Sequence, residues 1–549
     1  MAVGASLADY AALQKLATDF WEWRAANQPV SYDDIPRIER SAGWISDWSR
    51  QAIERRRTEL LEFTKRHEAI DPGSWPVSQQ VDYRLIGSAL ARVHWELNVT
   101  RAHELNPGFY VDQTLGVLFL SLLKPPPFDE ERSRVIINAL QSFTGTVDQA
   151  RENLTGHAIK PFALAAIEKL ADIRPRLTKV AAELSSFLSG VDSAELNEAT
   201  DMALNALESF HDWLNSQLAS MAETTAVGRE AYVYFLKHVA LMPYMPEQLL
   251  VMGKHEWERS VAFETCEQTR NQDVLDLKLF PDQAAQMERE AIEEENARSF
   301  LEEKNILTVP GWLKHYRNLP LPPYLEPLTF MGVTDDLTSD TRLHEDGISY
   351  IKRPSPDLDY FALSIAKDPR PLIVHEGVPG HYCQMALSWA HENPIRRRYY
   401  DSGANEGIGF YAEEMMLQFG FFDDSPKLRE IMYNFMRLRA LRVEVDVKLA
   451  LGLFTIDQAA EYLEKIVPVD RGTARQEAVF FASSPGQAIT YQIGKQQIIK
   501  FLADARLQQG RKFTLRNFHD FLWKNGNVPI VLLRWEYLGL KDEIEVLDS

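Results

Sequence analysis

The sequence predicts a mainly α-helical protein that carries a small β-sheet insert. Three observations support this fold class. Apolar residues recur at helical spacing along most of the 549 residues, and prolines and glycines separate these helical patterns. Between residues 305 and 365, prolines precede short β-like runs instead. The hydrophobic content of 45% and the charged content of 25% are those of an ordinary globular protein.

The first 221 residues are predicted to form amphipathic helices, with breaks at Pro72-Gly73, at residues 125–127 and near Gly190. The expected helices cover residues 8–25, 36–68, 79–103, 129–154, 160–190 and 194–221. Because 549 residues are many for one core, we expect an N-terminal helical subdomain at 1–250 and a second helical subdomain at 251–549.

The second subdomain is expected to contain the insert, with β-like runs at 328–333, 348–351 and 360–363. The acidic run at 293–295 predicts a solvated helix face. Residues 428–451 predict one long helix, and Thr455 with Gln458 predicts a capping box that starts a helix reaching about residue 466. A later helix should carry Gln487 and Tyr491 on one face, because they are four residues apart.

Residues 375–381, which read HEGVPGH, have the residue types of a zinc hydrolase site at an unusual spacing. In the common H-E-x-x-H motif, two histidines four residues apart share a helix face, bind the metal, and flank a Glu that activates water. Here His375 and His381 are six residues apart, which places them about 120° apart around a regular helix. Pro379 lacks a backbone N–H, and Gly377 and Gly380 accept unusual backbone angles. We therefore expect a break or a double bulge that brings both histidines to one metal.

Glu406 follows the second histidine by 25 residues and is the expected third ligand, which would complete a His2Glu zinc site with one open position for water. The alternative interpretation is a Gly-Pro turn with a capping Glu and two packed histidines. Cys383 lies two residues past His381, and a helix turns about 200° over that distance, so we expect a packed thiol rather than a ligand. A His2Glu set accepts metals other than Zn2+ as well.

The pattern H-E-x-x-P-G-H-x-x-Q at 375–384, followed by Glu406-Gly407 and by Tyr-Ala-Glu at 411–413, resembles the bacterial family called domain of unknown function 885. Further matches are P-G-Q-A at 485–488 with Tyr491 and Gly494, N-G-x-V-P at 525–529, and a weaker element at Asn106-Pro107. The resemblance covers nearly the whole chain. That family is considered similar to the helical gluzincin metallopeptidases, which implies a multi-helix peptidase architecture with a deep cleft.

The resemblance also implies roles for individual residues. Glu376 would be the general base that takes a proton from water and passes it to the leaving amine. Tyr491 would donate to the oxyanion, and Gln487 would help to hold the substrate backbone. For Tyr491 the alternative is a packed aromatic whose hydroxyl bonds the backbone. In the related peptidases a short sheet edges the cleft and pairs with the peptide, so we expect the same of the insert.

Two departures from the family pattern stand out. Members commonly read V-D-T-G-x-H where this chain has VDVKLA at 445–450, so Ala450 replaces a histidine. The upstream R-P-G segment is only approximated, by Arg353-Pro354-Ser355. If the histidine at 450 binds the substrate carbonyl, this chain lacks a transition-state contact.

The net charge of −20 argues against nucleic acid or an anionic membrane surface as a partner. No basic segment followed by an apolar run begins the chain, and no stretch approaches 18 uninterrupted apolar residues. The two cysteines, Cys266 and Cys383, give no disulfide framework, so we expect a cytoplasmic protein.

Three hypotheses for the function follow. The first is a zinc peptidase that acts on short peptides. The second is a metal hydrolase that acts on another small amide, and the third is a peptidase-derived protein that binds without catalysis, which the change at Ala450 keeps open. The sequence leaves the oligomeric state and the choice between exo and endo cleavage open.

Overall fold

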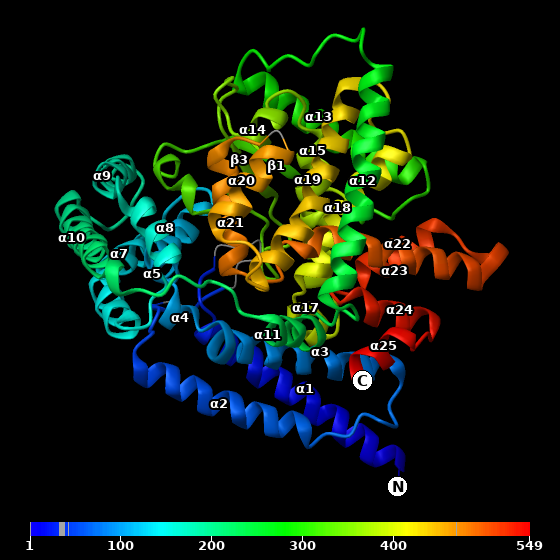
Figure 1. Ribbon diagram of the computed structural model, residues 1–549, viewed down its shortest axis with the longest axis horizontal. Coiled ribbons are helices and arrows are strands. Elements are labelled where there is room, and N and C mark those ends of the chain that lie inside the picture. The colour runs from blue at the N-terminus through cyan, green and yellow to red at the C-terminus, as the bar shows by residue number, and fades with distance from the viewer. Residues whose placement is uncertain (1, 32–38, 42, 468) are drawn as a thin grey trace.

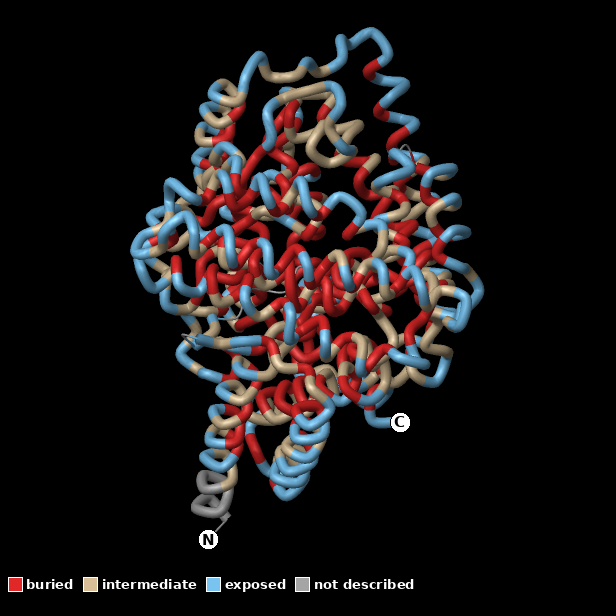
Figure 2. The backbone as a smooth tube through the Cα atoms, turned by 90° about the vertical axis from the view of Figure 1, so that its left-hand side faces the viewer, coloured by how far each residue is buried: buried red, intermediate tan, exposed pale blue. Residues whose placement is uncertain are grey.

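The computed structural model describes residues 2–31, 39–41, 43–467 and 469–549. It confirms a mainly helical chain with one small sheet (Figure 1). Buried residues fill the interior between the helices, and the exposed residues cover the outside (Figure 2). Among the described residues, no helix is both long enough and apolar enough to cross a membrane.

The N-terminal helices α1 (Ala2–Asn27), α2 (Arg50–Glu68) and α3 (Val77–His94) pack together at one end of the molecule (Figure 1). The prediction of one helix over 36–68 is wrong in its first part, although 36–38 and 42 lie outside the described residues. The helix begins at Arg50 because the side chain of Ser49 accepts a hydrogen bond from Ala52 N–H. The predicted helix at 79–103 changes into a π-helical turn and ends at Arg101, which has a φ of 44°.

A second group of helices surrounds α7 (Glu130–Leu154) and α10 (Ser193–Gln217). Asp129 and Asp192 are the N-caps of these two helices, and the side chain of each accepts a backbone N–H of the first turn. The predicted helix at 160–190 is wrong as a single element, because the chain turns at residues 171–172. The remaining elements up to residue 239 are η1 (Trp95–Thr100), α4 (Ala102–Leu105), α5 (Pro107–Val111), η2 (Asp112–Gly116), α6 (Val117–Leu123), α8 (Lys160–Leu170), α9 (Ile173–Leu184), η3 (Leu218–Ser220), α11 (Arg229–Tyr234) and η4 (Phe235–Val239).

The sheet has the strand order β1-β3-β2 and consists of β1 (Tyr316–Pro320), β2 (Asp335–Asp336) and β3 (Gly347–Ile351). β1 runs parallel to β3, and β2 runs antiparallel to it. The predicted strand at 348–351 is confirmed. The other two are wrong: Pro327 lies in the first turn of a 3-10 helix, η5 (Glu326–Met331), and Asp359 caps a helix, α14 (Tyr360–Ile365).

Helix α13 (Gln283–Glu303) covers the free edge of β1. The carboxylate of Glu290 accepts the N–H of Asn318 at 3.1 Å, and Glu294 accepts the N–H of Tyr316 at 3.3 Å. These two side chains take the place of a neighbouring strand. Glu290 and Glu294 are buried, and so is Glu293, which pairs with Arg289. The prediction of a solvated face at 293–295 is therefore wrong for the first two residues.

Helices α18 (Ser402–Gln418) and α22 (Ile489–Gln509) cross with their backbones in contact. A Cβ atom added to Gly494 would lie 2.1 Å from the carbonyl oxygen of Gly403 and 2.8 Å from the Cα of Gly407. Only glycine permits this approach. The crossing holds two parts of the predicted site, Glu406 and Tyr491, in a fixed relation.

Helix α12 (Pro246–Arg270) contains the predicted subdomain boundary at 250, and the largest core draws residues from both sides of it. The long helix α19 (Pro426–Ala450) and the capping box at Thr455, which starts α20 (Ile456–Ile466), are confirmed. The other elements of this half are α15 (Arg370–Leu372), η6 (Ile373–Gly377), α16 (His381–Trp389), α17 (Pro394–Arg398), α21 (Arg471–Ser483), η7 (Gly510–Lys512), α23 (Leu515–Lys524), α24 (Ile530–Leu538) and α25 (Asp542–Asp548).

Candidate metal centre

The two histidines of the motif belong to different helical segments. His375 lies in η6, a single π-helical turn, and His381 is the first residue of α16. Between them Val378 is extended, with φ −121° and ψ 121°, so the predicted break is confirmed. A Cβ atom on Gly380 would lie 1.8 Å from the carbonyl oxygen of His375, which explains why this position is glycine.

The break brings three donor atoms together. Nε2 of His375 lies 3.4 Å from Oε2 of Glu406, and Nε2 of His381 lies 3.3 Å from the same oxygen. Two ligands at about 2.1 Å from a tetrahedral zinc ion are separated by about 3.4 Å, so the donor set fits this ion in both chemistry and spacing. The three side chains are 1–7% exposed, and Nδ1 of His381 has no hydrogen-bond partner among the described residues.

Gly409 makes room for the two imidazoles. It follows Glu406 by three residues on α18, and a Cβ atom there would lie 2.9 Å from Cε1 of His381 and 3.1 Å from Cε1 of His375. The ring centroids of the two histidines are 4.7 Å apart with the planes at 77°. Any side chain at position 409 would therefore push the rings away from their common point.

A second carboxylate, missed in the sequence analysis as a site residue, orients the first histidine. Nδ1–H of His375 donates to Oε1 of Glu413 at 2.5 Å, and Arg439 of α19 donates to the same carboxylate at 2.9 Å. This hydrogen bond leaves Nε2 as the nitrogen that carries the lone pair. Burial lowers the pKa of His375, but the hydrogen bonds with Glu406 and Glu413 outweigh it and the pKa is raised. The sequence contained a signal for the role of Glu413, because residue 413 follows residue 406 by seven positions, or two helical turns.

Glu376 faces the open side of the centre. Its carboxylate oxygens lie 4.0 Å from Nε2 of His375 and 3.9 Å from Nε2 of His381. The side chain is 24% exposed and lines a cavity of about 260 Å3 together with Asp335 of β2 and Ser349 of β3. The predicted base is thus beside the predicted ligands and reachable from solvent, with the sheet as the opposite wall.

Tyr491 also lies at the centre. Its ring is nearly parallel to that of His375, with centroids 6.3 Å apart, and the guanidinium of Arg442 lies 4.8 Å from the Tyr491 centroid. The side chain is 7% exposed. The structure therefore places this predicted residue against a predicted ligand.

Gln487 lies elsewhere than predicted. Helix α22 begins at Ile489, so Gln487 is in the preceding turn and the predicted helical face with Tyr491 is wrong. The reason is Asp446 of α19, whose carboxylate accepts the N–H groups of Gly486 and Ala488 at 2.9 and 2.7 Å and so fixes the turn. Gln487 lines a cavity of about 150 Å3, apart from the one at Glu376.

Two further residues from the sequence analysis are packed in the interior. Cys383 is fully buried on α16, where burial raises the pKa of its thiol to about 12, and the prediction of a packed thiol is confirmed. Ala450 is buried in an apolar cluster with Tyr232 and Ile489. It lies 11 residues, or about 16 Å along α19, from Arg439. The replacement of the family histidine is thus in the core and not among the donor atoms.

Comparison with known proteins agrees with the motif. Residues 36–296 and 353–536 match the model of a family described as bacterial proteins of unknown function, domain of unknown function 885. The chain belongs to this family. The residues between the two matched parts contain the whole sheet.

Solved structures share the fold over almost the full length. One is a "putative lipoprotein" from Colwellia psychrerythraea, at 16% identity and a TM-score of 0.73, covering 99% of both chains. Another is a "putative lipoprotein of unknown function" from Shewanella oneidensis, at 17% identity and a TM-score of 0.67, covering 96% of this chain and 98% of the other. No curated protein matches the chain.

Proposed function

We propose that this member of the domain of unknown function 885 family is a zinc-dependent hydrolase that cleaves the peptide bonds of short peptides. The observation that carries the proposal is the convergence of His375, His381 and Glu406 on one point, with the carboxylate of Glu376 about 4 Å from both imidazoles. Two imidazoles and one carboxylate are the donor set of a catalytic zinc site, and a second carboxylate beside them is suited to act as its base. A gluzincin-like architecture with a deep cleft is part of the same proposal.

Zinc bound by His375, His381 and Glu406 would polarise the substrate carbonyl and make water acidic enough to react at neutral pH. Glu376 takes the proton from the attacking water and returns it to the leaving amine, since it is the carboxylate on the solvent side of the centre. Tyr491 donates to the oxyanion, a role that its position on the His375 ring supports.

The sheet supports a peptide as substrate. The β1 edge is closed by Glu290 and Glu294, whereas residues 332–335 at the other edge line the cavity that contains Glu376. An extended peptide can add to such an edge through its backbone. We propose that β2 holds the substrate strand next to Glu376.

The metal is tested first. Elemental analysis of the purified protein should find about one zinc per chain in wild type and none in His381→Ala. Absence of zinc from the wild type, even after zinc is added back, would favour a binding protein without catalysis.

Hydrolysis is tested next, with short peptides compared against acylated amines and amino-acid amides. Wild type should cleave the peptides, and Glu376→Gln should keep its zinc but lose turnover by about 10²-fold or more. Turnover that persists in Glu376→Gln would contradict its role as base, and cleavage of the other amides alone would replace peptides by that substrate class.

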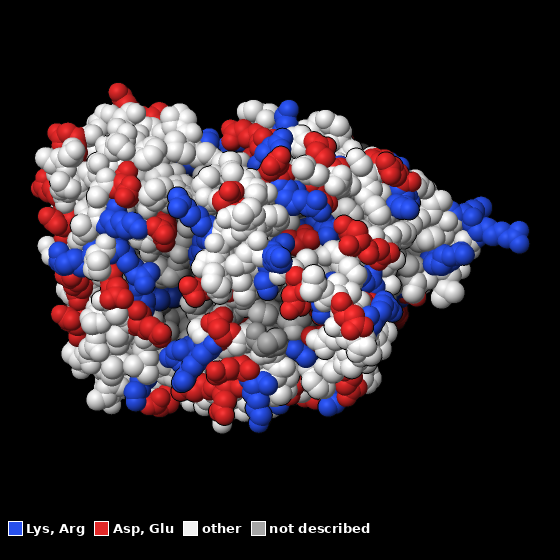
Figure 3. Space-filling view, turned by 90° about the horizontal axis from the view of Figure 1, so that it is seen from above, with Lys and Arg blue, Asp and Glu red and all other residues white. Residues whose placement is uncertain are grey.

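We further propose that the protein acts in the cytoplasm without a nucleic-acid or membrane partner. Acidic and basic side chains are interspersed on the face seen in Figure 3, which is hollowed near its centre. Fractionation of cells that express the full-length gene product tests the location, and recovery in the membrane fraction would contradict it.

A further inference from the structure

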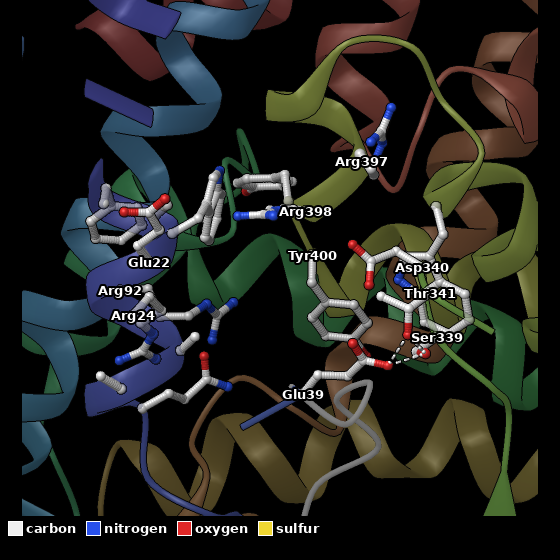
Figure 4. Close-up of a pocket in the computed structure, with 18 of the residues that line it drawn as sticks. Glu22, Arg24, Glu39, Arg92, Ser339, Asp340, Thr341, Arg397, Arg398 and Tyr400 are labelled. Carbon is white, nitrogen blue, oxygen red and sulfur yellow. Dashed lines mark hydrogen bonds between the residues drawn. The ribbon is translucent and has the colours of Figure 1, made fainter. Parts of the chain in front are cut away.

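A second large cavity lies beside α16, the helix that begins with His381. It has a volume of about 480 Å3 and is bounded by α1, α3, α16 and the segment that follows α17 (Figure 4). Aromatic side chains form much of its wall, including Trp21, Trp389 and Tyr400. A cavity of this size is typical of sites for small ligands, and nothing in the proposed chemistry of zinc and Glu376 uses it.

The cavity begins one helical turn from the metal ligands. Met385 lines it and follows His381 by four residues, so both side chains lie on one face of α16, about 6 Å apart along the axis. On the other side, the hydroxyl of Tyr400 donates to Oδ1 of Asn405 at 3.4 Å, and Asn405 is the neighbour of Glu406. The cavity therefore borders the two helices that carry His381 and Glu406.

The inner wall of the cavity is basic. Arg24 and Arg92 come from α1 and α3 on one side, and Arg398 comes from the end of α17 (Figure 4). Arg24 is buried and paired with Glu96 at 2.5 Å, but Arg92 forms no ion pair with any described carboxylate. Arg92 also lines the cavity that contains Gln487, so it stands where the two cavities meet.

The acidic residues of this cavity lie away from Arg92. Glu22 is exposed, and Glu39 is exposed and accepts hydrogen bonds from the hydroxyls of Ser339 and Thr341. Asp340 is on the wall opposite Arg24 and Arg92 (Figure 4). The carboxylates that line this cavity therefore do not pair with Arg92, and the negative charge that it influences is that of the buried Asp401.

Other arginines near the cavity add positive charge. Burial, together with Arg24, lowers the pKa of Arg40 to about 10. Burial also lowers the pKa of Arg56 to about 10, and Nη1 of Arg56 is buried without a hydrogen-bond partner among the described residues. In a chain with a net charge of −20, a group of arginines beside one cavity favours an anion there.

We propose that Arg92 binds the C-terminal carboxylate of the peptide substrate, so that the metal centre removes one or two residues from the free C-terminus. This inference rests on the proposed function. Arginine is the side chain best suited to a carboxylate, because its planar N–H groups bind both oxygens. The aromatic wall would accommodate an apolar side chain on the terminal residue.

The rise of α18 from Asp401 to Glu406 is about the length of two extended peptide residues. Asp401, the N-cap of α18, is buried with a pKa raised to about 6, and Arg92 is close enough to oppose that rise. Glu406 follows Asp401 by five residues, or about 7.5 Å along the helix. Two extended peptide residues span about 7 Å.

The test measures binding in Glu376→Gln, which separates recognition from hydrolysis. Titration calorimetry would compare N-acetyl-Ala-Ala-Phe, which has a free carboxylate, with its C-terminal amide. The acid should bind about 10- to 100-fold more tightly than the amide, as expected for a hydrogen-bonded charge. Adding Arg92→Gln should abolish the difference, and Arg92→Lys should keep part of it.

Arg84→Gln is the matched control. Arg84 is on the same helix, eight residues earlier, and pairs with Asp548 away from the cavity, so its replacement should leave the preference unchanged. Equal binding of acid and amide, binding of neither, or a preference that survives Arg92→Gln would overturn the inference. A preference for the acid in a protein whose wild type cleaves no peptide would instead refute the proposed function and leave the carboxylate site standing.

Discussion

Replacing Glu413 by Gln should weaken zinc binding without removing a metal ligand. The Glu413 carboxylate accepts Nδ1–H of His375 and is the partner of Arg439. A neutral amide oxygen in its place makes the imidazole less basic and holds its orientation less firmly. Zinc affinity depends on both properties.

The size of the effect follows from the kind of contact. Loss of an outer carboxylate of this type costs about 10- to 100-fold in metal affinity, or about 1.4–2.7 kcal/mol. At a fixed excess of zinc, the stabilisation of the folded protein by the metal should fall by the same amount. Arg439, which is 6% exposed, also loses its counter-ion, so the metal-free variant should be less stable by about 3–5 kcal/mol.

Zinc affinity is measured by competition with a chromophoric chelator, and stability by denaturant unfolding with and without zinc. Glu414→Gln is the control, because Glu414 is the next residue of α18 and pairs with Lys495 and Arg259, away from the histidines. Both variants should lose stability, but only Glu413→Gln should lose zinc affinity. Equal zinc affinities in the two variants would refute the reasoning.

Three further predictions follow. Gly409→Ala should reduce zinc affinity, because the added methyl group would press on both imidazoles. The control is Gly145→Ala, whose methyl group would lie in open space and should leave zinc affinity unchanged. Zinc affinity is measured by chelator competition, and equal affinities in the two variants would contradict the steric argument. Burial raises the pKa of Glu290 to about 7, so the native protein holds this proton more tightly than the unfolded chain and the free energy of unfolding falls as pH rises from about 5 to 8. Glu290→Gln should reduce that fall by up to about 3 kcal/mol in urea unfolding, and an unchanged slope would count against it. Ala450→His should destabilise by about 1–3 kcal/mol without raising peptide turnover; higher turnover would restore a catalytic role for this position.

The sequence predicts the metal ligands well because the chemistry restricts them to a few residue types. His375, His381 and Glu406 meet as expected, and Pro379 with its flanking glycines signals the break between the histidines. Long helices were also predictable, since α7, α10 and α19 have strong periodicity and clear ends.

The errors concern contacts between segments distant in the chain. Nothing local to residues 290–294 indicates that their carboxylates cap β1, because the strand lies more than 20 residues away. The turn at Gln487 depends on Asp446, 41 residues earlier. β1 has the polar sequence YRNLP and becomes a strand through β3 on one side and α13 on the other.

The non-helical step at residues 378–380 has a consequence for engineering. Since His375 and His381 lie on independent helical segments, their relative direction is set by the three residues between these segments and not by helical pitch. Deleting two residues to recreate the four-residue spacing would rotate one imidazole away instead of improving the motif. Sequence searches that require a four-residue spacing between the histidines will miss proteins of this kind. Structure searches that compare the directions of the donor atoms will find them.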